Sequence, residues 1–347
     1  MIRPQWAQLA LNPPCALGEA LGSGTLRAQP EDFEVEEDLG FAASGDGQHV
    51  LLKVRKRDAN TQWVARELAA LGRCRPADVG YAGLKDRRSV AIQWFTVPAA
   101  TRSVEEWIGL HGNGFEVLEA GAHARKLPRG ALAGNRFAIR IRDVTVSHEL
   151  IAARLEQIRR RGVPNYFGAQ RFGHDGANLA AIEAGVRALD RTARGFMLSA
   201  ARSLIFNGVL AARVRDGSWE QLELGELANL DGRGSIFAVS ELEPSLQERC
   251  ARLALHPTGP MWGRGAPAVQ GRLLQLEEGI ARDLAAAAEA TQEAGLTQER
   301  RSLRVAVRGL DWTNENGAIV LRFRLGRGSF ATGVLREIFA CRPTSPA

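Results

Sequence analysis

The chain of 347 residues has a formal net charge of +6, and with 45% hydrophobic and 24% charged residues it has the composition of a soluble globular protein of one or two domains. No uninterrupted apolar run approaches the ~18 residues of a membrane-spanning helix, and the first residues lack the apolar region of a signal peptide, so we expect a cytoplasmic protein without a membrane span. The positive charge comes mostly from arginine and indicates an anionic partner such as RNA or DNA, although a genome rich in arginine codons would produce the same bias.

The first part of the chain alternates predicted strands with a predicted helix. The spacing of Val64, Leu68 and Leu71 predicts an amphipathic helix over residues 61–71 that ends at Gly72. Residues 136–142 alternate so that Phe137, Ile139 and Ile141 face one way and three arginines face the other, which predicts a sheet with one packed and one basic face. The other predicted strands of this part are residues 49–54, 90–97 and 115–118.

A predominantly helical block follows. Ser147 is predicted to cap a helix that ends at Gly162, and from about residue 176 to 299 the patterns are mostly helical. The predicted helices of this block are residues 177–189, 196–214, 245–255 and 273–294, and strands return only at 303–307 and 319–325.

A helical block between two strand-rich ends indicates an inserted domain. We therefore expect residues 1–160 and 305–347 to form one discontinuous catalytic domain and residues 161–304 to form a helix-rich α/β insertion.

The segment Gly80-Tyr81-Ala82-Gly83-Leu84-Lys85-Asp86-Arg87-Arg88 is the most informative in the chain. It places one carboxylate among three cations on a glycine-rich turn directly before a strand. Neighbouring positive charge favours the ionised carboxylate, which suits a nucleophile, and the cations suit a polyanionic substrate. The alternative is a solvated turn aspartate paired with Lys85 or Arg87.

Several motifs, in this order along most of the chain, resemble those of the tRNA pseudouridine synthase D family. The catalytic motif is Gly83-Leu84-Lys85-Asp86-Arg87 with Gln93-Trp94, and the most recognisable signature is Asn165-Tyr166-Phe167-Gly168-Ala169-Gln170-Arg171-Phe172-Gly173. The remaining segments that carry the resemblance are Pro30-Glu31-Asp32-Phe33-Glu34-Val35, Leu132-Ala133-Gly134-Asn135-Arg136-Phe137 and Gly328-Ser329-Phe330-Ala331-Thr332.

The resemblance implies an α+β pseudouridine synthase fold with a mixed, largely antiparallel sheet flanked by helices, plus the insertion. It also implies an enzyme of tRNA processing, an isomerase that converts uridine to pseudouridine in tRNA, at position 13 in bacterial members. Such enzymes need no cofactor or metal, in agreement with four cysteines without a CxxC pair and six histidines without HxxxH or HxH spacing. We expect a monomer that binds tRNA.

The resemblance also implies the roles of the site residues. Asp86 would be the nucleophile that acts on a flipped-out uridine. Phe33, Phe137 and Phe330 are candidates for stacking on the base, although Phe137 also fits the packed face of its strand and Phe330 could pack as a helix staple or lie near a phosphate. Asn135 could bind the uracil edge or hold the Asp86 loop; an ordinary turn asparagine is the alternative.

The cations near these motifs are candidates for RNA contact. Lys85 is expected to bind substrate or to hold Asp86, and Arg87 and Arg88 are candidates for contact with the RNA backbone. Arg171 is the candidate for RNA contact in its signature, whose aromatic residues otherwise fit a structural role between domains.

Two other functional classes remain as alternatives. A non-catalytic RNA-binding protein, such as a tRNA-folding chaperone, would use the same basic and aromatic residues but would give Asp86 no role. A nucleotide-dependent enzyme is set aside, because Gly22-Ser23-Gly24 and Gly326-Arg327-Gly328 complete neither a GxGxxG nor a Walker A pattern.

Overall fold

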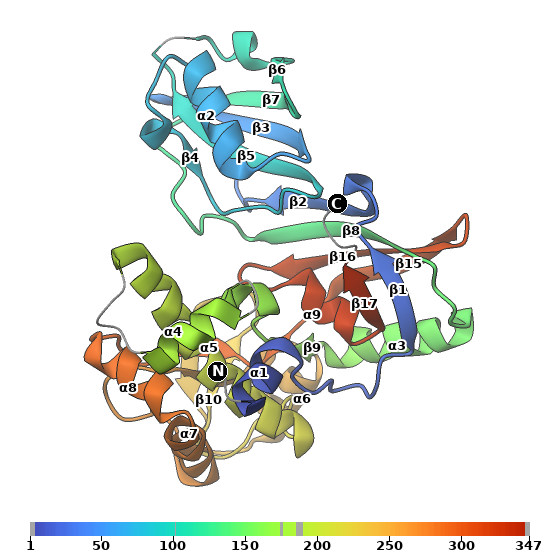
Figure 1. Ribbon diagram of the computed structural model, residues 1–347, viewed down its shortest axis with the longest axis vertical. Coiled ribbons are helices and arrows are strands. Elements are labelled where there is room, and N and C mark those ends of the chain that lie inside the picture. Colours follow the sequence, from blue (N-terminus) through green and yellow to red (C-terminus); the bar gives the residue numbers. More distant parts are fainter. Residues whose placement is uncertain (1–3, 101, 174–175, 185–189, 344–347) are drawn as a thin grey trace. The chain divides into compact units, whose positions relative to one another are not determined.

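The computed structural model describes residues 4–100, 102–173, 176–184 and 190–343, and the chain divides into two compact units (Figure 1). The sheet unit comprises Gly22–Ser147, Arg308–Gly328 and Phe339–Ala347. The helical unit comprises Met1–Leu21, His148–Val307 and Ser329–Ile338.

Within the described residues, an 11-stranded sheet forms the body of the sheet unit, with β15, β16, β8, β2, β5, β3, β7 and β6 as successive neighbours. Strands β1 and β17 pair in parallel, as do β2 and β5, whereas the other pairs are antiparallel. The predicted α+β class with a mixed, largely antiparallel sheet is therefore confirmed. The strands are β1 (Gly22–Leu26), β2 (Phe33–Asp38), β3 (His49–Arg57), β4 (Gly80–Tyr81), β5 (Val90–Pro98), β6 (His111–Gly112), β7 (Phe115–His123), β8 (Gly134–Arg142), β15 (Arg308–Glu315), β16 (Ala318–Gly326) and β17 (Phe339–Pro343).

Helix α2 (Thr61–Leu71) covers one face of this sheet and has the bounds that the sequence predicts (Figure 1). The Asn60 side chain caps it by accepting a hydrogen bond from the Gln62 amide at 2.8 Å, and Gly72 ends it. Val64 and Leu68 are fully buried in one cluster with residues of β3 and β5. Each such side chain contributes about 1.5–3 kcal/mol on burial, so this layer fixes β3 and β5, the strand that follows the Asp86 loop. The 3₁₀ turns of the unit are η1 (Pro30–Asp32), η2 (Pro76–Asp78) and η3 (Glu105–Trp107).

The alternation predicted along β8 is confirmed, because Phe137, Ile139 and Ile141 are buried and Arg136 is exposed. The predicted basic face, however, is not a free cationic surface. Its arginines have carboxylate partners: Arg136 lies 3.8 Å from Glu36, Arg140 lies 2.6 Å from Glu315, and Arg142 lies 2.7 Å from Asp32. The sequence pattern missed this neutralisation because the partners come from β2, η1 and β15.

The helical unit is built around α5 (Arg191–Arg215), whose buried residues form the centre of its hydrophobic core. The Asp190 side chain caps α5 by accepting from the amides of Thr192 and Ala193 at 2.8 Å. The other helices are α1 (Pro4–Leu11), α3 (His148–Arg161), α4 (Ala177–Ala184), α6 (Pro244–Ala251), α7 (Gly271–Asp283), α8 (Ala285–Glu293) and α9 (Ala331–Arg336), with the 3₁₀ turn η4 (Ala169–Phe172).

Among the described helices, α5 is long and apolar enough to cross a membrane. The sequence analysis did not single it out, because arginine and asparagine interrupt its apolar run. In the structure 67% of its most apolar 18-residue window is buried, as in the core helix of a soluble protein.

Strands inside the helical block correct the sequence-based description of it. The prediction of a helix over 245–255 is wrong at its end, since α6 stops at Ala251 and Leu255 begins strand β12 (Leu255–Met261). Pro257 and Pro260 concealed this strand, because proline argues against a ladder position. The strands of this unit are β9 (Val163–Pro164), β10 (Leu227–Leu230), β11 (Ile236–Ala238), β12, β13 (Glu299–Ser302) and β14 (Arg304–Val305), and among them β11, β10, β12 and β13 form one sheet.

Two further helix predictions need correction. The helix predicted over 273–294 is divided into α7 and α8, because Leu284 has φ −108° and ψ 38°, outside the α-helical region. Helix α4 follows the prediction to Ala184, and residues 185–189 of that prediction lie outside the described residues.

The compact units do not coincide with the boundaries predicted near residues 160 and 304. Helix α3 and the segments Met1–Leu21 and Ser329–Ile338 group with the helical unit. Arg154 of α3 donates to the backbone carbonyls of Glu19 and Glu337, so one side chain joins all three segments. The division into a catalytic and an inserted domain remains a prediction.

Candidate active site

The loop between β4 and β5 carries Asp86 and is held by buried side chains. Gln93 Nε2 donates to the Gly83 carbonyl at 2.7 Å, and the Lys85 amide donates to Thr61 Oγ1 at 3.0 Å. Ser89 Oγ donates to the Asp86 carbonyl at 2.7 Å. Gln93, Thr61 and Ser89 are almost fully buried, so the loop backbone has a defined position before any substrate binds.

Lys56 of β3 is a second support for the same carbonyl. Its side chain is fully buried, and its Nζ donates to the backbone oxygens of Asp86 at 2.9 Å and Ala59 at 2.7 Å. Burial lowers the pKa of Lys56 to about 8, and the Asp86 carboxylate acts in the opposite direction. A buried ammonium thus fixes the backbone of the residue whose carboxylate points outward.

The Asp86 carboxylate itself pairs with Arg27, the residue after β1. The Asp86 side chain is 51% exposed and that of Arg27 is 25% exposed. Arg27 has φ +59°, an uncommon conformation for a residue with a Cβ, and its guanidinium lies 4.1 Å from the centroid of the Phe33 ring. Arg27 therefore links the carboxylate to the aromatic part of the site.

Lys85 does not hold Asp86, which corrects one of the two roles expected for it. Its ammonium pairs with Glu37 of β2, and the two side chains are 10% and 0% exposed. Glu37 Oε2 also accepts from the Trp94 amide at 3.0 Å. Lys85 thus ties the loop to β2 and β5, and the cation expected beside Asp86 is Arg27 instead.

Phe33, Asn135 and Phe137 lie on one face of the sheet, as the register of β2 and β8 requires. Phe33 pairs with Ile139, and Glu37 pairs with Asn135. The rings of Phe33 and Phe137 meet edge to face with centroids 6.1 Å apart, and Phe137 stacks on Phe323 at 5.3 Å. Three predicted site residues from two distant motifs are therefore neighbours.

The site residues on these strands are largely buried. Phe33 lies in an acidic segment, yet it is only 5% exposed because Arg27 and Phe137 cover it. Asn135 Oδ1 is buried and has no hydrogen-bond partner among the described residues. A buried carbonyl with free acceptor capacity is suited to a donor on a ligand.

Arg87 and Arg88 flank the loop on its outer side. Arg87 is exposed and lies 3.5 Å from the Asp58 carboxylate, while Arg88 is half-buried. Both stay candidates for RNA contact.

Arg171 and Phe330 belong to the helical unit, where they line one small cavity of about 190 Å³ together with Phe196. Phe330 precedes α9 as its N-cap residue, and its ring centroid lies 6.5 Å from that of Phe167. Arg171 Nη1 donates to Ser199 Oγ at 3.0 Å, and burial lowers the pKa of Arg171. The structure thus groups these two residues from separate motifs.

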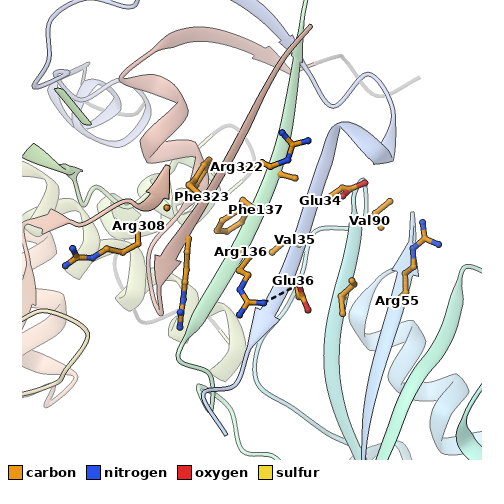
Figure 2. A pocket seen from close by; sticks show the side chains of 14 residues that line it. Glu34, Val35, Glu36, Arg55, Val90, Arg136, Phe137, Arg308, Arg322 and Phe323 are labelled. Atoms are coloured by element: carbon orange, nitrogen blue, oxygen red, sulfur yellow. Dashed lines mark ion pairs between the residues drawn. The ribbon is translucent and has the colours of Figure 1, made fainter. Parts of the chain in front are cut away.

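A larger depression of about 520 Å³ lies over the sheet unit, between β16, β8, β2 and β5 (Figure 2). Its lining includes Glu34, Glu36 and Arg136, which alternate along their strands with Phe33, Glu37 and Asn135 and so belong to the opposite face of the sheet. Five arginines line it beside two glutamates, and Figure 2 shows the Arg136–Glu36 ion pair between them. This mixture of charges is not arranged around Asp86.

Sequence reasoning missed Arg27, Glu37, Lys56 and Thr61. None of them was recognised as part of a motif, and each acts on a residue at least 24 positions away. The only local signal was weak: Glu37 and Lys56 are charged residues at positions of β2 and β3 that alternate with exposed ones.

The arrangement presents one half-exposed carboxylate on a rigid loop, paired with a guanidinium. It also provides aromatic rings and an unsatisfied amide oxygen on the neighbouring strands. Such a carboxylate can attack an electrophilic carbon or accept a proton.

Comparisons with known proteins agree with the sequence motifs. The profile of the family described as tRNA pseudouridine synthase D (TruD) matches residues 18–182 and 177–338. A tRNA pseudouridine synthase D of Nitrosococcus oceani is 44% identical over 325 residues, which cover 92% of this chain and 91% of that protein. A tRNA pseudouridine synthase D of Methylococcus capsulatus is 43% identical over 335 residues, covering 95% of both.

A solved structure shows the same fold. The crystal structure of a Methanosarcina mazei protein assigned to TruD has a TM-score of 0.73 at 20% identity and covers 98% of both chains. The predicted pseudouridine synthase fold is therefore confirmed. With its profile matched over most of the chain and relatives more than 40% identical along nearly their whole length, this chain belongs to the tRNA pseudouridine synthase D family.

Proposed function

We propose that this protein is an isomerase that converts a uridine of tRNA to pseudouridine, at position 13, with Asp86 as the nucleophile. The observation that carries the proposal is the half-exposed Asp86 carboxylate paired with Arg27 on a loop whose backbone is fixed by Lys56, Ser89, Gln93 and Thr61. The names of the closely similar relatives support the reaction class.

The reaction requires few catalytic groups. The N1–C1′ bond of the uridine breaks, the uracil turns, and a C5–C1′ bond forms; the proton lost from C5 is balanced by a proton gained at N1. Asp86 either attacks C1′ to form an ester or removes the 2′ proton, and both routes need a carboxylate near the sugar. No atom is added or removed overall, because the ester breaks when C5 bonds to C1′ or, in the other route, Asp86 returns the 2′ proton.

The surrounding residues take different parts in this scheme. Arg27 positions the Asp86 carboxylate, and Asn135 Oδ1 accepts a hydrogen bond from the uracil edge. Phe137 and Phe33 form the apolar wall beside the base. Because Lys85 is paired with the buried Glu37, its part is to support the loop rather than to bind the substrate.

The proposed partner is tRNA, and we propose that the protein acts on it as a monomer in the cytoplasm. The proposed reaction uses no metal or cofactor. The principal alternative, a non-catalytic RNA-binding protein or tRNA chaperone, gives no reason for a rigid loop that presents an aspartate. The relatives are named as synthases, and they support the catalytic proposal.

The test uses unmodified tRNA transcripts incubated with the wild-type protein. Pseudouridine is mapped by carbodiimide labelling and primer extension, and a transcript with cytidine at position 13 serves as the control. We expect one pseudouridine, at position 13, in each transcript with uridine at that position and none in the control transcript. Absence of pseudouridine would contradict the function, whereas modification at another position would contradict only the site.

A further inference from the structure

A cationic groove separate from the Asp86 loop lies between α2 and residues 126–129 of the sheet unit. We propose that this groove binds the phosphodiester backbone of the RNA substrate, beside the segment that enters the active site. This inference rests on the proposed function, because it assumes that the protein acts on a tRNA.

The groove has an apolar floor and a polar rim. It has a volume of about 610 Å³, and Ala65, Val79 and Tyr81 form part of its floor. The exposed Gln62 and Arg66 lie along its α2 side. It is open to solvent rather than an enclosed cavity.

The charged side chains that line the groove are all positively charged. Arg66, Lys126 and Arg129 line the groove, and its described lining contains no aspartate or glutamate. Glu67 and Asp78 are the acidic residues adjacent in sequence to the lining. The Asp78 carboxylate accepts from Nε and Nη2 of Arg75 at 3.0 Å, and Arg75 and Lys126 both lower its pKa. Three cations with no carboxylate in the same lining attract a polyanion, in contrast to the mixed charges of the depression of about 520 Å³ in Figure 2.

The walls are ordered before binding. The Leu127 amide donates to Thr96 Oγ1 at 2.8 Å, and the Gly130 amide donates to the Ala82 carbonyl at 2.7 Å. The Arg129 guanidinium lies 3.6 Å from the centroid of the Tyr81 ring. A cation that is already stacked loses less side-chain freedom when it contacts a phosphate.

The floor of the groove is close in sequence to the catalytic loop. Tyr81 precedes Asp86 by five residues, so their Cα atoms are at most about 18 Å apart. That distance corresponds to a few nucleotides of a strand. A phosphate held in the groove is therefore close enough to belong to the same RNA segment as the target uridine.

The double variant Arg66→Gln/Lys126→Gln tests the groove and leaves Arg129 on Tyr81. Binding of unmodified tRNA is measured by filter retention between about 50 and 200 mM salt, with pseudouridine formation at saturating tRNA as a second readout. Loss of two phosphate contacts should reduce the magnitude of the slope of log K against log salt by about 1.5 and weaken binding roughly tenfold at 100 mM salt. The rate at saturation should stay within twofold of wild type.

The matched control is Arg159→Gln/Arg160→Gln on α3, which removes the same charge from arginines paired with Glu156. The control should bind tRNA as the wild type does. Equal losses in both variants would show an effect of net charge and would overturn the proposal, as would wild-type binding by the groove variant. A wild-type protein that makes no pseudouridine, yet binds tRNA through the groove, would refute the proposed function and leave this inference standing.

Discussion

Arg27 determines the orientation of the Asp86 carboxylate, although no sequence motif of the family includes it in this chain. It combines an ion pair with Asp86, a contact with the Phe33 ring and a positive φ. Residues in uncommon backbone conformations persist when their surroundings require them. We infer that the position of this guanidinium is maintained for function.

Replacing Arg27 therefore tests positioning. Arg27→Gln should lower the single-turnover rate by roughly 10- to 100-fold, because a misplaced carboxylate loses most of its advantage. Arg27→Lys should recover part of the rate, while tRNA affinity changes little in either variant. Arg55→Gln, an exposed arginine of the same sheet, is the control, and an equal loss of rate in that variant would contradict the assigned role.

The lowered pKa of Lys56 predicts a pH dependence of the free energy of unfolding. Its folded pKa of about 8 lies below the ordinary value of 10.5, so between these pH values the unfolded chain binds more protons than the folded one. The free energy of unfolding contributed by Lys56 should therefore rise with pH across this window, by at most about 3 kcal/mol. The charged groups that act on it are Asp86, Lys85, Glu37 and Asp58.

The variant Lys56→Met should lose this pH-dependent gain. Urea unfolding at pH 7, 8, 9 and 10 measures it, and the difference in unfolding free energy between wild type and variant should grow in favour of the wild type as the pH rises. A difference that is constant across the window would contradict the lowered pKa. The variant should also lower the catalytic rate more than tRNA affinity, since it removes a donor from the Asp86 carbonyl.

At the scale of elements, the pairing of β8 with β16 places Asn135 opposite Leu325 and Phe137 opposite Phe323. Gly134 begins β8 and pairs with Gly326 at the end of β16. A Cβ at Gly134 would lie 2.3 Å from the Leu325 carbonyl, whereas a Cβ at Gly326 would meet no heavy atom within 4 Å. Of these two paired glycines, Gly326 has room for a side chain with a Cβ and Gly134 has not.

This difference predicts opposite outcomes for two alanine variants. Gly134→Ala should lower the free energy of unfolding by about 2–4 kcal/mol and reduce activity, because the strands must separate next to Asn135. Gly326→Ala should change stability by less than about 1 kcal/mol. Thermal unfolding and pseudouridine formation measure both, and similar stabilities of the two variants would argue against the register of β8 and β16 at this point.

The motifs predicted which residues gather in the site, but not how they are supported. Phe33, Asn135 and Phe137 meet because period-two strands in fixed register bring their side chains to one face. The partners of Asp86 and Lys85 could not be predicted from local pattern. Each ion pair joins positions 48 or 59 residues apart in sequence, and its formation depends on the tertiary fold.

At the scale of the whole molecule, the sequence predicts the α+β class and the helix-rich middle of the chain, but not the strands within that middle. Strand β12 is buried, yet it contains two prolines and a glycine, so local propensity argues against it. Its neighbours β10 and β13 supply the pairing that overrides propensity. The break between α7 and α8 at Leu284 likewise could not be predicted, because no proline or glycine marks it in the sequence.

The net charge of +6 predicts that tRNA binding by the wild-type protein depends on salt. Affinity should fall by roughly 40- to 150-fold between about 50 and 200 mM monovalent salt, which corresponds to about three or four phosphate contacts. Many arginines are paired with carboxylates, so we do not expect the steeper loss of a protein that neutralises ten phosphates. Fluorescence anisotropy with labelled tRNA measures this, and an affinity independent of salt would contradict a phosphate-dominated interface.

The most direct test of the central claim is the single-turnover rate of pseudouridine formation by Asp86→Asn, compared with wild type on the same tRNA. Asparagine keeps the shape of the side chain but cannot act as a nucleophile or base. We predict a rate at least a thousandfold lower, with the dissociation constant for tRNA within about threefold of wild type. A variant that forms pseudouridine at a rate within tenfold of wild type would contradict the account.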